Sequence, residues 1–205
     1  AYEISLGLVG SEMCIRDRRW NPRSVRDLQG LHLGVLGMGP IGQAVARRAQ
    51  GFGMEVLGWS RSGRAVAGVR GVSLPALLEA SDFVSVHVAL AAETRGLIDA
   101  RALASMKQGA VLVNTARGGI VDEAALIQSL RSGHLGAVGL DVFEREPAGG
   151  DHPLLDFPNA VLTPHIGSAS TGTRIRMAEL AVENLVAGLE GRPLPCCANP
   201  EVLER

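Results

Sequence analysis

The stretch LHLGVLGMGPIG, residues 31–42, decides the fold of this chain. Its first half is a short run rich in Leu and Val, which is typical of a strand buried on both faces of a parallel sheet. Its second half, Gly37-Met38-Gly39-Pro40-Ile41-Gly42, places three glycines in the spacing G-x-G-x-x-G between that strand and a helical pattern. In this context the first glycine permits a tight turn, the second lets the backbone approach a pyrophosphate, and the third allows close packing of helix and strand. We therefore expect residues 37–42 to bind a dinucleotide at the start of a helix.

The rest of the chain repeats this alternation of apolar runs and helical patterns. Strands are expected at residues 31–37, 54–59, 82–88, 110–115, 136–142 and 159–164, and helices at 40–52, 73–81, 99–107, 122–132 and 171–190. Ser73, Asp99 and Asp122 are candidate N-caps and Gly133 is a candidate C-cap. The alternation predicts an α/β fold with a doubly wound parallel sheet of the Rossmann type. Right-handed crossovers would place the carboxyl ends of all strands at one edge, where a ligand is expected.

Composition excludes several classes of protein. The chain has 205 residues, 46% of them hydrophobic, 20% charged and 3% aromatic, with a formal net charge of -1. These values argue against a disordered chain and against a nucleic-acid binder. No apolar run approaches the roughly 20 residues of a membrane span, so we expect no membrane association. Cys14, Cys196 and Cys197 cannot build a disulfide framework, and free thiols indicate a cytoplasmic protein.

The first 18 residues, AYEISLGLVGSEMCIRDR, do not share the pattern of the rest. They show neither helical nor strand periodicity, and they resemble a translated adapter sequence of the kind found at the edges of assembled reads. We expect residues 1–18 to be a non-native leader, with an ordinary N-terminal tail as the alternative. A dinucleotide-binding domain is then expected over residues 19–168, and a C-terminal helix and tail over 169–205.

The end of the second strand bears on the choice of cofactor. An acidic residue about 20 positions after the glycine-rich turn would favour NAD, because it hydrogen-bonds the ribose 2′-hydroxyl. The sequence here is Trp59-Ser60-Arg61-Ser62-Gly63-Arg64, which contains no carboxylate. Ser60, Arg61 and Arg64 suit a 2′-phosphate, so we expect NADP(H) to be preferred, with NAD(H) possible. A solvated basic loop that is indifferent to the phosphate is the alternative.

Three further motifs follow expected strands: NTARGGIVDE (114–123), LDVFEREP (140–147) and TPHIGS (163–168). With these motifs in this order, the chain from about Trp20 to Arg205 resembles the D-isomer-specific 2-hydroxyacid dehydrogenases. The resemblance implies that Arg117, Glu146 and His165 are the catalytic residues. The HIGSAS and WSRS sequences look most like the glyoxylate/hydroxypyruvate reductase branch.

These three residue types suit the reduction of a small 2-oxo acid. The ordinary pKa of histidine lets His165 donate a proton near neutrality. Glu146 is suited to orient that imidazole, and the planar guanidinium of Arg117 is suited to bind the substrate carboxylate. Taken singly, each residue has a structural alternative: a strand-end ion pair for Arg117, a turn residue for Glu146 and a loop histidine for His165.

The resemblance also implies further cofactor contacts and partners. Asp141 would hold the nicotinamide carboxamide, and His87 and Thr94 fall in a cofactor-contacting loop in which Ala89 replaces the usual proline. Thr115 and Gly167 complete the expected cofactor-binding set. Family members carry a substrate domain ahead of this one, and we expect it to be largely absent here, so that the isolated chain turns over poorly. A homodimer is expected as well.

Other functions stay open at this point. Another 2-hydroxyacid dehydrogenase, of the phosphoglycerate, phosphite or 2-ketogluconate type, has the same motifs, and so does a nucleotide-sensing, corepressor-like binding protein. A methyltransferase shares the glycine-rich turn but does not need the three later motifs. His32, His134 and His152 show no partner pattern in the sequence, and no cluster has the spacing of metal ligands, so we expect no metal.

Overall fold

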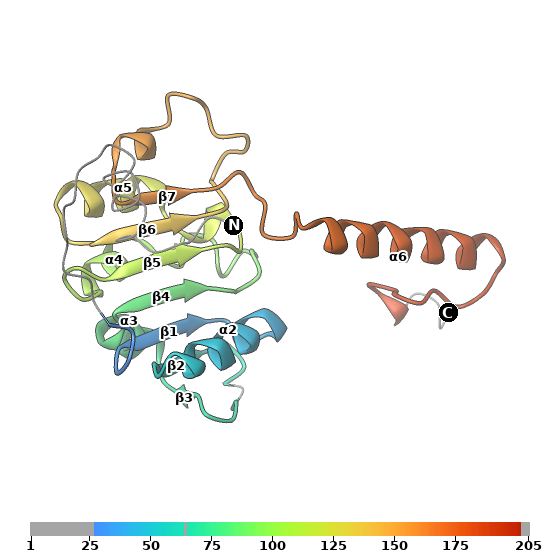
Figure 1. Cartoon of the computed structure of the whole chain (residues 1–205), viewed down its shortest axis with the longest axis horizontal. Helices are drawn as coiled ribbons and strands as arrows, with labels where there is room; N and C mark the ends of the chain where they lie inside the picture. Colours follow the sequence, from blue (N-terminus) through green and yellow to red (C-terminus); the bar gives the residue numbers. More distant parts are fainter. Residues whose placement is uncertain (1–26, 64, 202–205) are drawn as a thin grey trace, which may run out of the picture. The chain divides into compact units, whose positions relative to one another are not determined.

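Seven parallel strands form one sheet in the order β3-β2-β1-β4-β5-β6-β7 in the computed structural model, which describes residues 27–63 and 65–201 (Figure 1). The strands are β1 (His32–Leu36), β2 (Glu55–Trp59), β3 (Arg70–Gly71), β4 (Phe83–Val86), β5 (Val111–Asn114), β6 (Ala137–Leu140) and β7 (Ala160–Leu162). The helices are α2 (Pro40–Gly51), α3 (Leu74–Ala80), α4 (Ala100–Ser105), α5 (Glu123–Arg131) and α6 (Thr171–Leu189), with short 3-10 helices η1 (Gly118–Ile120) and η2 (Pro153–Asp156). This strand order confirms the expected doubly wound Rossmann fold.

Helices cover both faces of the sheet. Successive side chains of a strand point to opposite faces, so the apolar side chains of each central strand must be buried on both of them. Leu33 and Val35 of β1 pack with Ala46 of α2 in one apolar cluster. A Cβ on the intervening Gly34 would lie 2.4 Å from the side chain of Leu77 in α3, on the other face. The larger apolar cluster lies on this second face and also includes side chains of α4 and α5. Both faces of the central strands are therefore buried, which explains their near-continuous apolar sequence.

The expected elements are present with small differences at their ends. All five helices form, and the side chains of Ser73, Asp99 and Asp122 cap α3, α4 and α5 as expected. The C-cap of α5 is Ser132, and Gly133 follows it with φ of +73°, so the expectation that Gly133 is the cap was wrong by one position. The two-residue strand β3 was not predicted, because it is too short to leave a periodic pattern and exists through its pairing with Leu57 and Gly58.

The chain divides into two compact units, one ending at Pro164 and the other comprising residues 165–205. The second unit contains α6, which begins after the N-cap Ser170 and exposes most of its apolar side chains. Cys196 and Cys197 in this unit are free thiols. Within residues 27–63 and 65–201, no helix is both long enough and apolar enough to cross a membrane.

Candidate active site

The expected site residues of the first unit follow the carboxyl ends of the strands. Gly37 comes directly after β1, Ser60 after β2, His87 after β4, Thr115 after β5 and Asp141 after β6. Backbone hydrogen bonds continue between neighbouring segments beyond the strand ends, since His87 N–H donates to Leu36 O (2.6 Å) and Asp141 N–H donates to Asn114 O (3.0 Å). Parallel pairing therefore brings segments from distant parts of the sequence to one edge of the sheet.

The three glycines of the glycine-rich turn differ in backbone conformation and in the space around them. Gly37 has φ of +103°, and a Cβ there would lie 2.5 Å from the carbonyl oxygen of His87. A Cβ on Gly42 would lie 1.9 Å from the carbonyl oxygen of Gly37, so only glycine lets α2 approach the turn this closely. Gly39 is the N-cap of α2 and has open space where a Cβ would stand. The helix begins with Pro40, and its cap has no side chain to satisfy the first N–H groups, which suits an anion at this end.

The turn that carries Arg117 is held by Asn114, the last residue of β5. The Asn114 side chain is fully buried; its Oδ1 accepts from Ala116 N–H (3.0 Å) and its Nδ2 donates to Arg117 O (2.9 Å). Arg117 itself is exposed, and its guanidinium donates to Ala116 O (2.6 Å). A buried amide with both ends satisfied fixes the backbone at Arg117 while the guanidinium remains open to solvent.

The segment that carries Glu146 packs directly against the Arg117 turn. A Cβ on Gly118 would lie 1.9 Å from the carbonyl carbon of Phe143, so the two backbones meet with no room for a side chain between them. Glu146 is exposed, and its Oε1 accepts from Phe143 N–H (3.0 Å). The first unit therefore brings together the segments of two of the three expected catalytic residues.

Asp141 is a buried acidic residue among the expected site residues. The residue is 5% exposed, and its Oδ1 accepts from Thr163 Oγ1 (2.5 Å), which directly follows β7. Burying a carboxylate is costly unless it is hydrogen-bonded, and this contact provides part of the compensation. Thr115, by contrast, is exposed at the end of β5.

His87 and Thr94 bound the loop that follows β4. The imidazole Nε2 of His87 lies 2.8 Å from Ser85 Oγ, and burial lowers the pKa of His87 below its ordinary value, which favours the neutral ring. The Thr94 hydroxyl closes the loop on itself: it accepts from Ala91 N–H (2.8 Å) and donates to Ala89 O (2.7 Å). These hydrogen bonds hold the loop at the position where Ala89 replaces the usual proline.

The basic loop after β2 contains an ion pair that the sequence did not predict. Residues 60–63 form a turn in which Gly63 N–H donates to Ser60 O (3.0 Å). The Arg61 guanidinium lies 3.6 Å from the Glu93 carboxylate of the loop after β4, and both side chains are mostly exposed. Arg64, the third expected phosphate contact, lies outside the described residues.

His165 and Gly167 belong to the second unit, which begins at His165. His165 is exposed and has φ of +53°, a left-handed conformation that residues other than glycine seldom adopt. The segment follows Thr163, whose N–H donates to Leu140 O (2.9 Å). The assignments of His165 to catalysis and of Gly167 to cofactor binding stay predictions.

Three histidines that show no partner pattern in the sequence, His32, His134 and His152, have polar partners in the structure. His32 lies 3.2 Å from Glu55, His134 lies 3.2 Å from Gln108 Oε1, and His152 lies 2.9 Å from Glu123 Oε1. These partners are 23, 26 and 29 residues away, so no local spacing could reveal them. Among the described residues, no group of three or more His, Cys, Asp or Glu side chains is arranged to hold a metal ion.

Comparison with known proteins adds an independent line of support. The family model described as D-isomer specific 2-hydroxyacid dehydrogenase, NAD binding domain, matches residues 5–167. This match begins inside residues 1–18, and the expectation of a foreign leader there stays a prediction.

Individual relatives agree with the family match. A glyoxylate reductase from Korarchaeum cryptofilum is 48% identical over 90% of this chain and 58% of its own length. A crystal structure of a protein from Thermus thermophilus is 50% identical, with a TM-score of 0.85 over 92% of this chain and 61% of its own. A D-isomer specific 2-hydroxyacid dehydrogenase from Xanthobacter autotrophicus, in complex with NADPH and MES, is 38% identical, with a TM-score of 0.79 over 96% of this chain and 82% of its own.

The chain spans about 58% of the length of the curated relatives it matches. The family model that matches the chain describes an NAD binding domain, and the sheet order and the glycine-rich turn agree with that description. The chain belongs to the D-isomer specific 2-hydroxyacid dehydrogenase family.

Proposed function

We propose that this chain is the cofactor-binding part of a reductase that converts glyoxylate or hydroxypyruvate to the corresponding 2-hydroxy acid. One structural observation carries the proposal: the backbones beside Arg117 and Glu146 pack together through Gly118 and Phe143 at the carboxyl edge of the sheet. Several relatives are glyoxylate reductases or glyoxylate/hydroxypyruvate reductases B, and they indicate the substrate class.

The residues present fit a nicotinamide dinucleotide. The open space at Gly39 leaves room for a pyrophosphate against the backbone of residues 37–42, at the positive end of the α2 dipole. Thr115 and Asp141 follow the ends of β5 and β6, on the opposite side of β4 from β1 and β2, where they would contact the nicotinamide end. Three residues complete the proposed cofactor-binding set: His87, Thr94 and Gly167.

In the proposed reaction each catalytic side chain has one task. Arg117 binds the substrate carboxylate in a bidentate manner and polarises the neighbouring carbonyl oxygen. His165 donates a proton to that oxygen as the carbonyl electron pair moves onto it, and Glu146 stabilises the resulting imidazolium. The bound nicotinamide supplies the hydride that reaches the carbonyl carbon. The product is a 2-hydroxy acid, and a proton from solvent restores His165.

We also propose a preference for NADP(H). Ser60 and Arg61 are placed after β2, where the 2′ position of the adenosine ribose lies in this fold. An NADPH-dependent glyoxylate/hydroxypyruvate reductase from Sinorhizobium meliloti, whose crystal structure contains NADP, supports the same cofactor. A fluorescence titration of the chain with NADPH and with NADH tests this directly. Tighter binding of NADPH that is lost in Arg61→Asp is expected, whereas equal or tighter binding of NADH would contradict the preference.

The reaction itself is tested by oxidation of NADPH with glyoxylate and with hydroxypyruvate, using the whole protein. We expect turnover that is lost in His165→Ala and in Arg117→Ala while the affinity for NADPH is retained. A whole protein that binds NADPH but reduces neither substrate would contradict the proposed reaction and leave a nucleotide-sensing role.

Three further expectations stay proposals. We propose, from the family resemblance, that the enzyme is a homodimer, which light scattering during gel filtration measures. The cofactor domain is proposed to extend to about residue 168, and residues 169–205 to connect it to a substrate-binding domain. Cysteine usage supports a cytoplasmic location, which fractionation tests.

A further inference from the structure

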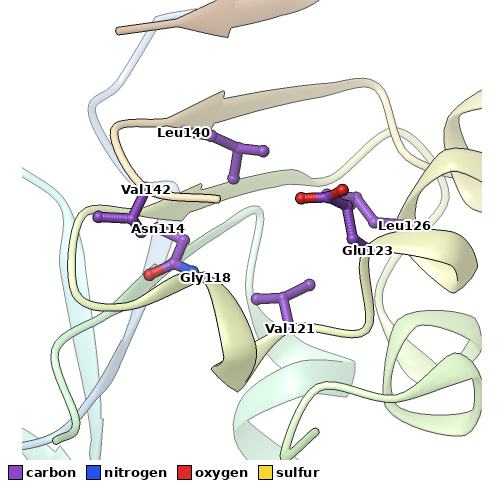
Figure 2. A pocket seen from close by; sticks show the side chains of 7 residues that line it. All are labelled: Asn114, Gly118, Val121, Glu123, Leu126, Leu140 and Val142. Atoms are coloured by element: carbon purple, nitrogen blue, oxygen red, sulfur yellow. The ribbon is translucent and has the colours of Figure 1, made fainter. Parts of the chain in front are cut away.

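Glu123 is a largely buried carboxylate to which neither the fold nor the proposed reaction assigns a role. It is the first residue of α5, and its side chain is 19% exposed. Figure 2 shows its carboxylate pointing into a small, mostly apolar hollow lined by Val121, Leu126, Leu140 and Val142. A carboxylate in such surroundings needs compensating hydrogen bonds, since its desolvation is costly.

Both oxygens of this carboxylate are hydrogen-bonded. Oε1 lies 2.9 Å from the Nε2 atom of His152, and Oε2 accepts from Glu144 N–H (3.3 Å). The position of Glu123 in the first turn of α5 adds a favourable interaction with the helix dipole. Glu123 thus joins the start of α5 to the segment that ends at Glu146.

The surroundings of His152 determine which ring nitrogen carries its proton. Nδ1 accepts from Leu154 N–H (3.3 Å) and so caps η2, which leaves Nε2–H to donate to Glu123. The imidazole is 13% exposed and meets Phe143 edge-on, with ring centroids 5.4 Å apart. His152 therefore contacts the Glu146 segment through Phe143 and supports Glu123 from the other side.

We propose that Glu123 and His152 form a positioning pair that fixes the direction of the Glu146 carboxylate. Residues 143–146 are held by three contacts that converge on two neighbouring amides: Gly118 packs against the Phe143 carbonyl, Glu123 accepts from Glu144 N–H, and Glu146 itself accepts from Phe143 N–H. Loss of the Glu123 contact frees the middle of the segment and with it the side chain that orients the catalytic histidine. The catalytic consequence rests on the proposed function.

A matched pair of His152 substitutions separates the positioning role from the capping role. His152→Asn keeps an acceptor near the place of Nδ1 for Leu154 N–H but loses the donor to Glu123. His152→Gln keeps a donor that reaches Glu123 but loses the cap. Glu123→Gln completes the set, because an amide has one acceptor oxygen and cannot satisfy both His152 and Glu144 N–H. Glu79→Gln, at an exposed glutamate of α3, serves as the control.

Two measurements are made on these variants. Turnover of glyoxylate by the whole protein is expected to fall about 10- to 100-fold in kcat for His152→Asn and Glu123→Gln, with KM changed less than about 3-fold, because misplacing a catalytic group by about 1 Å costs this much. We expect kcat within about 3-fold of the unsubstituted protein for His152→Gln and Glu79→Gln. Amide hydrogen exchange at Glu144 is expected to accelerate in the two impaired variants alone, and this result does not depend on activity.

Unchanged kcat in His152→Asn and Glu123→Gln would overturn the inference. An equal loss of kcat in His152→Asn and His152→Gln would also overturn it, because it would show that His152 has a purely structural role. Absence of turnover in the unsubstituted protein contradicts the proposed function and removes the catalytic consequence with it. Amide exchange at Glu144 distinguishes the two failures. If exchange is slow in the unsubstituted protein and faster in His152→Asn, the contact between Glu123 and Glu144 N–H is present, and only the proposed reaction is wrong.

Discussion

Gly39 and Gly42 belong to one motif but have different roles: Gly42 allows α2 to pack closely against the turn, and Gly39 leaves space for the cofactor. Alanine substitution at each position distinguishes these roles. At Gly42 an added Cβ would lie 1.9 Å from a backbone oxygen, so we expect Gly42→Ala to lower the free energy of unfolding by about 1–3 kcal/mol. At Gly39 the space is open, so Gly39→Ala costs at most about 1 kcal/mol as a poorer N-cap. Urea unfolding measures both values.

At Gly39, alanine substitution should affect NADPH binding more strongly than it affects the free energy of unfolding. The methyl group of Gly39→Ala would occupy the space proposed for the pyrophosphate, so NADPH affinity is expected to fall about 10-fold or more, which a fluorescence titration measures. Full NADPH affinity in a folded Gly39→Ala variant would place the phosphates elsewhere.

Glu93 is expected to weaken NADPH binding, because its carboxylate occupies the guanidinium of Arg61 that the 2′-phosphate is proposed to use. Exposed ion pairs contribute about 0.2–1 kcal/mol, so Glu93→Gln should tighten NADPH binding by up to about 5-fold. NADH has no 2′-phosphate, and its affinity should not change, which makes it the internal control. An equal gain for both cofactors would show that Glu93 acts through general charge and not through Arg61.

At the scale of single elements, the N-caps decide where the helices that border the site begin. Asp122 accepts from Ala125 N–H (2.9 Å) at the start of α5, one residue before Glu123. We expect Asp122→Ala to destabilise the chain by about 0.5–2 kcal/mol, whereas Asp122→Asn, which keeps an acceptor oxygen, should stay within about 0.5 kcal/mol. Thermal unfolding compares the two variants. Equal destabilisation by both would mean that the charge of Asp122, and not its acceptor, matters.

At the scale of the whole molecule, Asp82 connects three neighbouring strands at the edge opposite the site. Its Oδ2 accepts from His32 N–H (2.9 Å) at the start of β1, and its Oδ1 accepts from Lys107 Nζ (3.1 Å) ahead of β5. Burial by itself raises the pKa of Asp82, but these hydrogen bonds and the nearby positive charges outweigh it and bring the pKa below the ordinary value of 3.8. The ionised form is therefore stabilised by folding.

The stability that Asp82 contributes is present above its unfolded pKa and is lost as the pH falls through the lower folded value. We expect Asp82→Asn to lower the free energy of unfolding by about 1–3 kcal/mol at pH 7, with the difference shrinking toward zero in strong acid. Urea unfolding at several pH values checks this, with Asp156→Asn as an exposed control. A difference that is constant with pH would contradict the assignment.

Stability is not expected to be uniform along the chain. Ala187 is the one buried residue among those described for α6, whereas β1 and β4 are buried on both faces. Most of the stability of a helix in a protein comes from packing of its apolar face, so amide hydrogen exchange in the chain alone should be fast in α6 and slow in β1 and β4. Exchange in α6 as slow as in β4 would show that its apolar side chains are covered in solution.

The class of fold was predictable from the amino-acid sequence, because the signals that specify it are local. The apolar run at 31–37 and the glycines of 37–42 specify a buried strand and a tight turn without reference to any other segment, and Ser73, Asp99 and Asp122 mark helix starts in the same way. The positions of Asp141 directly after β6 and of Arg117 three residues after the end of β5 were predictable for the same reason. Parallel strands with right-handed crossovers have their carboxyl ends on one edge.

Features that depend on contacts between distant residues could be seen only in the folded structure. The strand β3 exists through its pairing with β2, the Arg61–Glu93 ion pair joins two loops, and His152 meets Glu123 across 29 residues. Nothing in a local pattern distinguishes a histidine that will be buried beside a carboxylate from one that will be solvated. Sequence periodicity specifies which elements form and in what order, whereas the packing of those elements determines which polar side chains lose water and must find a partner.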